Sequence, residues 1–231
     1  MEHNSRFMAS ALRLAATVIL VRTEAAQTQV LMLRRSAASP FMPGAFVFPG
    51  GAVDSADYER GHAAGWDDAR IAAEFRATLP RELAVDQPAV SARDAHALVH
   101  AAVRELDEEA SIALDPASLH LFSHWITPAT EPRRYDTHFF TAQAPAGARG
   151  TADSVETHDA AWISPADALA AHRRGEMHLV FPTIKHLERL AAFNSVDALL
   201  AFTREKPIVT IMPDRGPSEG VTLPRALEGQ W

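Results

Sequence analysis

The amino-acid sequence predicts an α/β protein with a mixed sheet between helices. Three features lead to this fold class. Strand-like, β-branched runs come first, beginning with residues 12–22. A long helical segment then runs from Ala92 to Ala110, and shorter strands and amphipathic helices follow it to the end of the chain. The length of 231 residues fits one domain, residues 1–231, with room for a sizeable insertion.

The first elements are a predicted β-hairpin and a loop. Residues 12–22 and 30–35 have the composition of strands, and the polar residues 24–29 between them predict a turn. A Pro/Gly-rich passage, residues 39–54, comes next and contains a short strand-like piece at 45–48. Such composition is typical of backbone that approaches a ligand closely.

The middle of the chain is predicted to be helical. Residues 58–91 are rich in Ala and charged residues, which predicts one or two helices broken at Pro80 and Pro88. A longer helix is predicted from Ala92 to Ala110, with Ser91 as its N-cap and a capping pattern completed by Asp94.

The second half alternates between strands and helices. We predict strands at 119–127, 136–144 and 158–164, and helices at 165–175, 182–193 and 195–202. Residues 207–213 (PIVTIMP) are predicted to add a strand at an edge of the sheet.

Composition restricts the class of partner. With 22 Lys and Arg against 29 Asp and Glu, the formal charge is −7, which argues against a nucleic-acid binder. There is no Cys to form disulfides, and the apolar stretch from Leu14 to Val21 is too short to cross a membrane. The first ten residues do not resemble a secretory signal, so we expect a cytoplasmic protein. An acidic protein that handles a polyanion must gather its arginines locally or recruit a cation.

The predicted helix at 92–110 presents three carboxylates on one face. Glu105, Glu108 and Glu109 fall within an arc of about 100° on a helical wheel, away from the apolar stripe of Val99, Val103, Leu106 and Ala110. Carboxylates this close raise each other's pKa unless a positive charge lies between them. Mg²⁺ or Mn²⁺, which prefer oxygen ligands, would supply that charge. Arg104 can hold Glu108, four residues on, in position.

A solvated acidic helix face is the alternative interpretation of these glutamates. The passage Phe48–Gly51 favours a metal site, because its glycines expose a backbone carbonyl that could serve as a further oxygen ligand.

The same residues resemble a known motif. Residues 104–109 (RELDEE), followed by Ala110, Ser111 and Ile112, resemble the second half of the Nudix box, R-E-U-x-E-E-x-G-U, where U is aliphatic. Gly51 and Asp57 resemble its first half, G-x5-E, with Asp in place of Glu. The resemblance implies a Nudix-type α/β/α sandwich in which Glu105, Glu108 and Glu109 bind two or three Mg²⁺ or Mn²⁺ ions. The Gly50 carbonyl would complete the site, and Arg104 would orient a glutamate.

Two departures from the box are visible. Ser111 replaces the glycine that normally ends the helix in a left-handed conformation, which removes no metal ligand. Forty-six residues, 58–103, separate Asp57 from Arg104 where the standard box has seven, so the chain carries an insertion of 39 residues. The insertion falls in the loop before the catalytic helix, where extra length costs little.

An inserted box of this kind is similar to the peroxisomal coenzyme A diphosphatases and their bacterial relatives. Residues 41–51, 125–140 and 162–169 resemble that branch. A looser coenzyme A pattern matches Leu31, Arg35, Ser36, Gly44 and residues 48–51, although Leu33 and Pro40 replace an expected Thr and Arg. The implied reaction is cleavage of the diphosphate in coenzyme A or acyl-coenzyme A. Open alternatives are ADP-ribose, NADH or a nucleotide sugar, a non-catalytic Nudix ligand-sensing module, and a structural protein with an acidic helix.

Several other residues are candidates for the site. Arg35, Arg133 and Arg134 could contact phosphate groups of the substrate, although surface charges are common in such places. Glu156, in a loop before the predicted strand at 158–164, could bind metal or activate water as loop glutamates do in several Nudix enzymes, or be an ordinary surface acid. Relatives often dimerise, so a homodimer is possible.

The histidines are expected to be structural. His96 and His100 have the spacing of a metal pair, but they project away from the glutamates and no Glu follows His96 as in a zinc-protease helix. We expect His120, His124, His138 and His158 to be hydrogen-bonded rather than catalytic.

Overall fold

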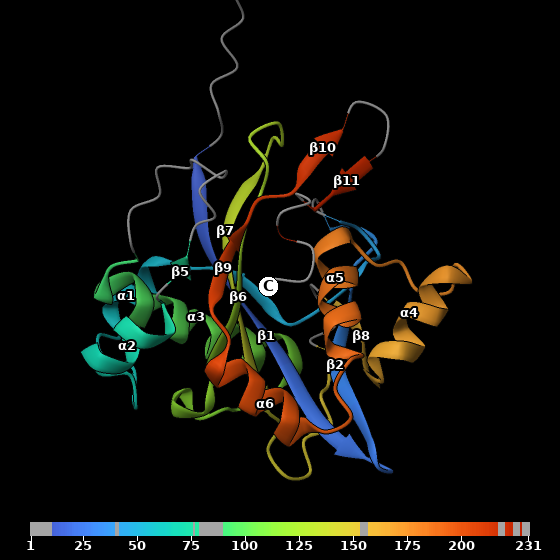
Figure 1. Cartoon of the computed structure of the whole chain (residues 1–231), viewed down its shortest axis with the longest axis horizontal. Helices are drawn as coiled ribbons and strands as arrows, with labels where there is room; N and C mark the ends of the chain where they lie inside the picture. Colours follow the sequence, from blue (N-terminus) through green and yellow to red (C-terminus); the bar gives the residue numbers. More distant parts are fainter. Residues whose placement is uncertain are drawn as a thin grey trace, which may run out of the picture.

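The computed structural model describes residues 11–39, 42–75, 77–78, 90–152, 157–216, 220–223 and 227 (Figure 1). Its centre is a nine-stranded sheet with the path β3-β2-β1-β7-β6-β9-β5, to which β4 adds on β1 and β8 on β2. The strands are β1 Leu12–Glu24, β2 Gln27–Arg35, β3 Phe46–Val47, β4 Gly50–Ala52, β5 Ala77–Thr78, β6 His120–Ile126, β7 Arg134–Gln143, β8 Thr157–Ile163 and β9 Ile208–Ile211, and a separate ribbon joins β10 Asp214–Gly216 to β11 Gly220–Thr222. The helices are α1 Ser55–Glu59, α2 Asp68–Glu74, α3 Ala92–Ala110, α4 Pro165–Arg173, α5 Phe181–Leu190 and α6 Val196–Glu205, with a 3-10 turn, η1, at Pro116–Ser118.

The sheet is mixed and covered on both faces, which confirms the predicted α/β sandwich. β1 runs parallel to β7 over ten paired residues, whereas β1 and β2 are antiparallel. Successive side chains of β1 point to opposite faces of the sheet. Ala16, Val18 and Leu20 pack in the core that contains α3 residues. Ile19 and Val21 pack in the core that contains residues of α5 and α6. In Figure 1, α1, α2 and α3 lie on one side of the sheet and α4, α5 and α6 on the other.

The β1–β2 connection is tighter than the predicted polar turn. Glu24 pairs with Gln27, so only Ala25 and Ala26 form the turn, with φ values of 49° and 62°. A two-residue hairpin of this type needs positive φ at both positions, which suits the right-handed twist of the strands.

Beyond this hairpin β1 and β2 separate, and the Gly-rich passage enters between them. β4 pairs with β1, opposing Thr17 to Gly50, while β3 pairs with β2, opposing Leu33 to Val47. Glycine is required at position 50: its φ is 155°, and an added Cβ would lie 2.4 Å from the carbonyl oxygen of Ala16.

The insertion is joined to the sheet. Its described part contains the end of α1, the helix α2, and β5, which pairs with β9. Trp66 and Phe75 pack edge-on against Phe140 of β7, at centroid distances of 6.0 and 6.1 Å. β9 therefore lies between β6 and β5, and the prediction that residues 207–213 add an edge strand is wrong in its position. Pro80 and Pro88, the predicted breaks, lie outside the described residues.

Helix α3 has the predicted bounds and the predicted N-cap, Ser91. The Ser91 side chain accepts a hydrogen bond from the Asp94 N–H at 3.1 Å. At the other end Ser111 adopts the left-handed conformation, with φ 54° and ψ 40°, so it takes the backbone shape of the glycine it replaces. Over the described residues, no helix combines the length and apolarity needed to span a membrane.

Candidate active site

Helix α3 presents its glutamates to a cavity of about 800 Å³. Glu105, Glu108 and Glu109 all line this cavity, together with Gly50 and Gly51 of β4. Their exposure differs: the side chains of Glu105 and Glu108 are 14% and 58% exposed, and Glu109 is 3% exposed. The three predicted carboxylates therefore line one cavity, at graded depths below the surface.

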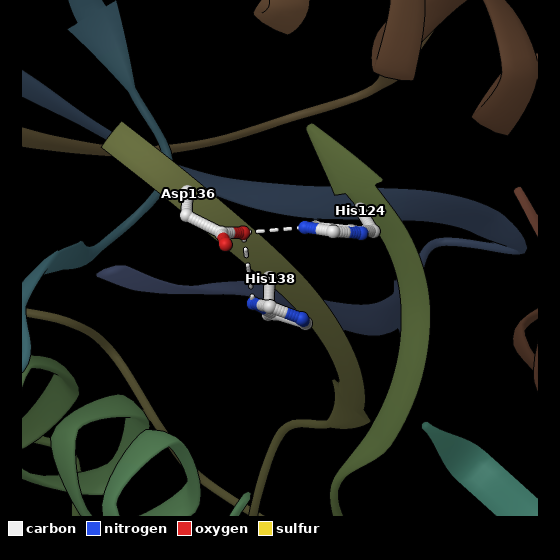
Figure 2. A group of neighbouring side chains, drawn as sticks. All are labelled: His124, Asp136 and His138. Atoms are coloured by element: carbon white, nitrogen blue, oxygen red, sulfur yellow. Dashed lines mark hydrogen bonds and ion pairs between the residues drawn. The ribbon is translucent and has the colours of Figure 1, made fainter. Parts of the chain in front are cut away.

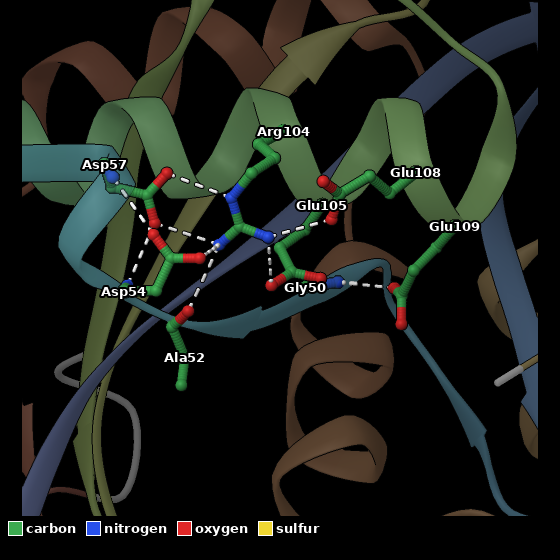
Figure 3. Close-up of polar contacts among 8 residues, drawn as sticks. All are labelled: Gly50, Ala52, Asp54, Asp57, Arg104, Glu105, Glu108 and Glu109. Carbon is green, nitrogen blue, oxygen red and sulfur yellow. Dashed lines mark hydrogen bonds and ion pairs between the residues drawn. The ribbon is translucent and has the colours of Figure 1, made fainter. Parts of the chain in front are cut away.

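Arg104 organises this cluster (Figure 3). One terminal nitrogen of its guanidinium donates to Glu105 at 2.9 Å and to Glu108 at 2.8 Å. The remaining nitrogens grip Asp57 bidentately, at 3.0 and 2.9 Å. These carboxylates raise the pKa of Arg104, the hydrogen-bonded Asp57 most of all. The predicted contact between Arg104 and Glu108 is present.

Asp57 is the buried anchor of the cluster. Its side chain is fully buried, and it forms a capping box with Asp54 at the start of α1: each side chain accepts the backbone N–H of the other residue. The Asp57 N–H is the largest factor that lowers the pKa of Asp54. Helix capping thus positions Asp57 to accept two hydrogen bonds from Arg104. Arg104 in turn donates to Glu105 and Glu108 and holds them in place.

The paired glycines of β4 let α3 approach. The Gly50 N–H donates to Glu109 at 2.9 Å. A Cβ on Gly51 would lie 2.3 Å from a carboxylate oxygen of Glu105, so any side chain at this position would displace the glutamate. The two glycines therefore leave space for carboxylates.

The donor set fits a hard divalent cation. Four carboxylates, those of Asp54, Asp57, Glu105 and Glu108, lie within 4.0 Å of one guanidinium, and Glu109 lies beside them. Arg104 cannot neutralise this charge alone. The ligand atoms available are oxygens, partly buried and turned into an open cavity, which suits Mg²⁺ or Mn²⁺ better than a softer metal.

The other predicted residues separate into three groups. Arg35 and Arg133 line the same cavity as the glutamates. Arg134 does not line it; its Nε donates to the Thr127 carbonyl at 3.1 Å. Glu156 lies outside the described residues.

Sequence reasoning did not single out several residues that line the cavity. They are Arg13 and Thr17 of β1, Asp54, and Thr127, Tyr135 and Thr137 around β7. The period of two along a strand shows that Arg13, Ala15 and Thr17 share one face of β1. Only the pairing of β1 with β4 and β7, however, identifies that face as a cavity wall.

His96 and His100 are structural, as expected. His96 contacts His62 at 3.0 Å through one ring nitrogen, and its other accepts the Ala63 N–H at 3.1 Å. His100 is hydrogen-bonded to the Gly61 carbonyl at 3.2 Å. Both histidines tie the insertion to α3, and burial lowers the pKa of each.

A second cluster, His124, Asp136 and His138, lies on β6 and β7 (Figure 2). His124 bonds Asp136 directly through Nε2 and Thr210 through Nδ1 at 2.8 Å. The two imidazoles are stacked nearly parallel, at 16° and 4.2 Å between centroids. Burial lowers the pKa of His138 to about 3. Because the in-plane lone pairs of parallel rings do not converge on one ion, this geometry favours a buried polar cluster of the core over a metal site. His124 is hydrogen-bonded as expected, whereas the Nδ1 of His138 has no hydrogen-bond partner among the described residues and lies 3.7 Å from Asp136.

Known proteins share the motif and the fold. A family model described as the NUDT19 Nudix domain matches residues 8–115, which include both halves of the box. A protein named nudix hydrolase 7 from Caenorhabditis elegans is 30% identical over 205 residues, covering 81% of this chain and 63% of its own length. The acyl-coenzyme A diphosphatase NUDT19 of Gallus gallus is 26% identical, covering 78% of this chain and 65% of its own length. The chain thus spans slightly less than two thirds of each relative.

A solved structure supports the fold. The crystal structure of a Nudix hydrolase from Alicyclobacillus acidocaldarius is 26% identical, with a TM-score of 0.63 over 83% of this chain and 96% of that one. Box residues, cavity geometry and relatives agree: the chain is similar to Nudix hydrolases and, among them, to the coenzyme A diphosphatases.

Proposed function

We propose that this protein is a metal-dependent diphosphatase that cleaves the diphosphate of a nucleoside-diphosphate-linked substrate. The observation that supports this best is the cluster of Glu105, Glu108 and Glu109 around Gly50 and Gly51, inside a cavity of about 800 Å³. A cavity of this volume suits a cofactor-sized ligand.

Each residue of the cluster has a proposed role. Glu105, Glu108 and Glu109 would hold Mg²⁺ or Mn²⁺ with the Gly50 carbonyl. When bound, the ions supply positive charge against the diphosphate and act as Lewis acids. Arg104 positions Glu105 and Glu108 through the contacts described above. The pre-set geometry matters because rate is lost when reacting groups are misplaced by about 1 Å.

The reaction needs a base and no covalent intermediate. A water oxygen attacks one phosphorus, the bond between that phosphorus and the bridging oxygen breaks, and the bridging oxygen leaves with the second phosphate. A carboxylate takes the proton of the water; the candidates are the glutamates of α3 and Glu156.

Coenzyme A or an acyl-coenzyme A is the favoured substrate. The printed activity of the NUDT19 relative is acyl-coenzyme A diphosphatase, and the family model that matches residues 8–115 is the NUDT19 Nudix domain. Besides Arg104, three arginines line the cavity and would attract a substrate with several phosphates: Arg13, Arg35 and Arg133. Arg134 remains a candidate only if its bond to Thr127 opens. The expected products are 3′,5′-ADP and a phosphopantetheine, and we propose the cytoplasm as the site of action.

A substrate panel tests this proposal. The protein is incubated with coenzyme A, acetyl-coenzyme A, ADP-ribose, NADH and a nucleotide sugar, each with Mg²⁺ or Mn²⁺, and the products are identified by mass. Release of 3′,5′-ADP from the coenzyme A compounds at the highest kcat/KM supports the proposal. A higher kcat/KM for ADP-ribose, NADH or the nucleotide sugar would support the diphosphatase activity but contradict coenzyme A as the substrate. Absence of turnover on the whole panel would favour a ligand-sensing module.

A further inference from the structure

Two arginines of the cavity take no part in the Arg104 cluster. Arg13, on β1, and Arg133, just before β7, both line the cavity and are exposed. In the ranges that the structure describes, neither guanidinium makes a hydrogen bond or an ion pair. In a chain whose formal charge is −7, two such cations facing one cavity suggest an anionic ligand.

Strand register places these arginines at one flank of the glutamate site. Thr17 lies opposite Gly50, and Arg13 is four residues earlier on β1, which corresponds to about 13 Å along the strand. Arg13 pairs with Tyr135 of β7, so Arg133 lies close by in sequence. Backbone and side-chain hydrogen bonds between Thr127 and Tyr135, at 2.9 and 3.0 Å, fix the loop that presents Arg133.

Arg35 lies at the other flank. It ends β2, the strand that pairs with β3, whereas the glycines of β4 pair with β1. Its guanidinium donates to Ser39 at 3.2 and 3.0 Å, and its backbone N–H donates to the Ala45 carbonyl. The cavity lining also includes the apolar residues Met42, Val47, Phe48, Val180 and Pro182. Val47 belongs to β3, which pairs with β2, and Val180 follows Leu179, the bridge partner of Phe46 in β3. Arg13 and Arg35 therefore flank the glutamates from different strands and would contact different parts of a substrate.

We propose that Arg13 and Arg133 form a subsite for a terminal phosphomonoester, and that the apolar flank beside Arg35 receives the uncharged arm of the substrate. This inference rests on the proposed function: in coenzyme A the phosphomonoester is the 3′-phosphate of the adenosine, and the arm is the pantetheine. A phosphomonoester carries nearly two negative charges at pH 7 and accepts bidentate hydrogen bonds from guanidinium groups. Diphosphates without this group, such as ADP-ribose and NADH, leave the subsite unused.

The subsite assigns distinct roles to the arginines. The coenzyme A pattern by itself places Arg35 first among candidates for the 3′-phosphate. The proposed subsite instead assigns the 3′-phosphate to Arg13 and to Arg133, which the sequence offers, with Arg134, as a reserve. Arg35 would contact the shared diphosphate or the pantetheine side.

Two substrates that differ by one phosphate test this assignment. kcat/KM is measured for coenzyme A and dephospho-coenzyme A in the wild type, Arg13→Ala/Arg133→Ala, Arg35→Ala and Arg173→Ala. Because both substrates meet the same mutant site, their ratio cancels general damage to the fold. We expect the ratio to fall roughly 10- to 100-fold in the double variant, which loses charge-assisted hydrogen bonds. Arg35→Ala should slow both substrates equally. Arg173→Ala, an exposed charge at the end of α4, should change neither.

A binding measurement separates this inference from the proposed activity. Calorimetry with 3′,5′-ADP and 5′-AMP should show tighter binding of 3′,5′-ADP to the wild type, and loss of that preference in the double variant. This comparison holds even if the substrate panel finds no hydrolysis of coenzyme A. Equal affinities in the wild type, an unchanged preference in the double variant, or a ratio that falls only in Arg35→Ala would each overturn the subsite.

Discussion

At the scale of single residues, the buried carboxylate of Asp57 is central to the site. It occupies the position of a glutamate in the Nudix box, and its shorter side chain still grips Arg104 at 2.9 and 3.0 Å. The capping box that Asp57 forms with Asp54 at the start of α1 holds it in this position. Asp57 thus differs in residue type from the box, but its carboxylate still forms an ion pair with Arg104.

Asp57→Asn should destabilise the fold and slow turnover. Asn cannot reproduce the two charge-assisted hydrogen bonds that the Asp57 carboxylate accepts from Arg104, so we expect a loss of about 1.5–3 kcal/mol in the free energy of unfolding. Without its anchor Arg104 holds Glu105 and Glu108 less well, and kcat should fall about tenfold or more. Denaturant unfolding and steady-state kinetics measure the two effects. Asp68→Asn, which removes an exposed carboxylate of α2, is the matched control. Wild-type kcat in Asp57→Asn would show that Arg104 does not position the glutamates.

At the scale of elements, α3 was predictable because its evidence is local. A helical wheel places Glu105, Glu108 and Glu109 together, and Ser91 and Ser111 mark the two ends. The opposite wall of the cavity was not predictable. Arg13 and Tyr135 meet only because β1 runs parallel to β7, a pairing between residues more than a hundred positions apart. No local pattern encodes such a register.

The C-terminal end of α3 gives an element-scale prediction. Ser111 has φ 54°, a left-handed conformation that costs energy for any residue with a Cβ. Ser111→Gly should therefore stabilise the protein by about 0.5–1 kcal/mol. The backbone bond from Ser111 N–H to the Asp107 carbonyl, 2.9 Å, remains available. Denaturant unfolding of the wild type, Ser111→Gly and Ser111→Ala measures this. If Ser111→Gly is no more stable than Ser111→Ala, the left-handed conformation at residue 111 does not strain the backbone, which would contradict this prediction.

At the scale of the whole molecule, the described part of the insertion packs against the sheet. β5 extends the sheet through β9, and Trp66 packs into the core beside Phe140. The box spacing predicts an insertion before α3 and its composition predicts helices; within the described part, α2 is helical. The sequence could not predict β5, because a two-residue strand has no periodicity to detect.

The buried His186 predicts how stability depends on pH. Burial lowers its pKa to about 3, and its neutral ring contacts the Ser123 hydroxyl at 2.6 Å and the Pro182 carbonyl at 2.7 Å. The unfolded chain binds a proton as pH falls through about 6.5, while the folded protein does not until about 3. Stability from this group is therefore full above pH 6.5 and is lost progressively as pH falls below it.

The variant His186→Gln removes this titration. Between pH 7.5 and 5.5 the wild type should lose about 1 kcal/mol more unfolding free energy than His186→Gln. Urea unfolding at both pH values measures the difference, and the other histidines, common to both proteins, cancel. Identical pH dependence in the two proteins would show that His186 does not titrate in this way.

The central claim is that the glutamates of α3 bind divalent metal and use it to cleave a diphosphate. The most direct measurement is product release from coenzyme A with and without Mn²⁺. It is made on the wild type, Glu105→Gln and Asp107→Asn, and the shift in Tm that Mn²⁺ causes is recorded for the same three proteins. Asp107 is an exposed carboxylate of the same helix that does not line the cavity, so its variant removes the same charge. We predict metal-dependent products and a Tm shift in the wild type and Asp107→Asn. Glu105→Gln should lose at least roughly 100-fold in turnover and most of the Tm shift. Turnover and metal stabilisation that survive in Glu105→Gln would contradict the account.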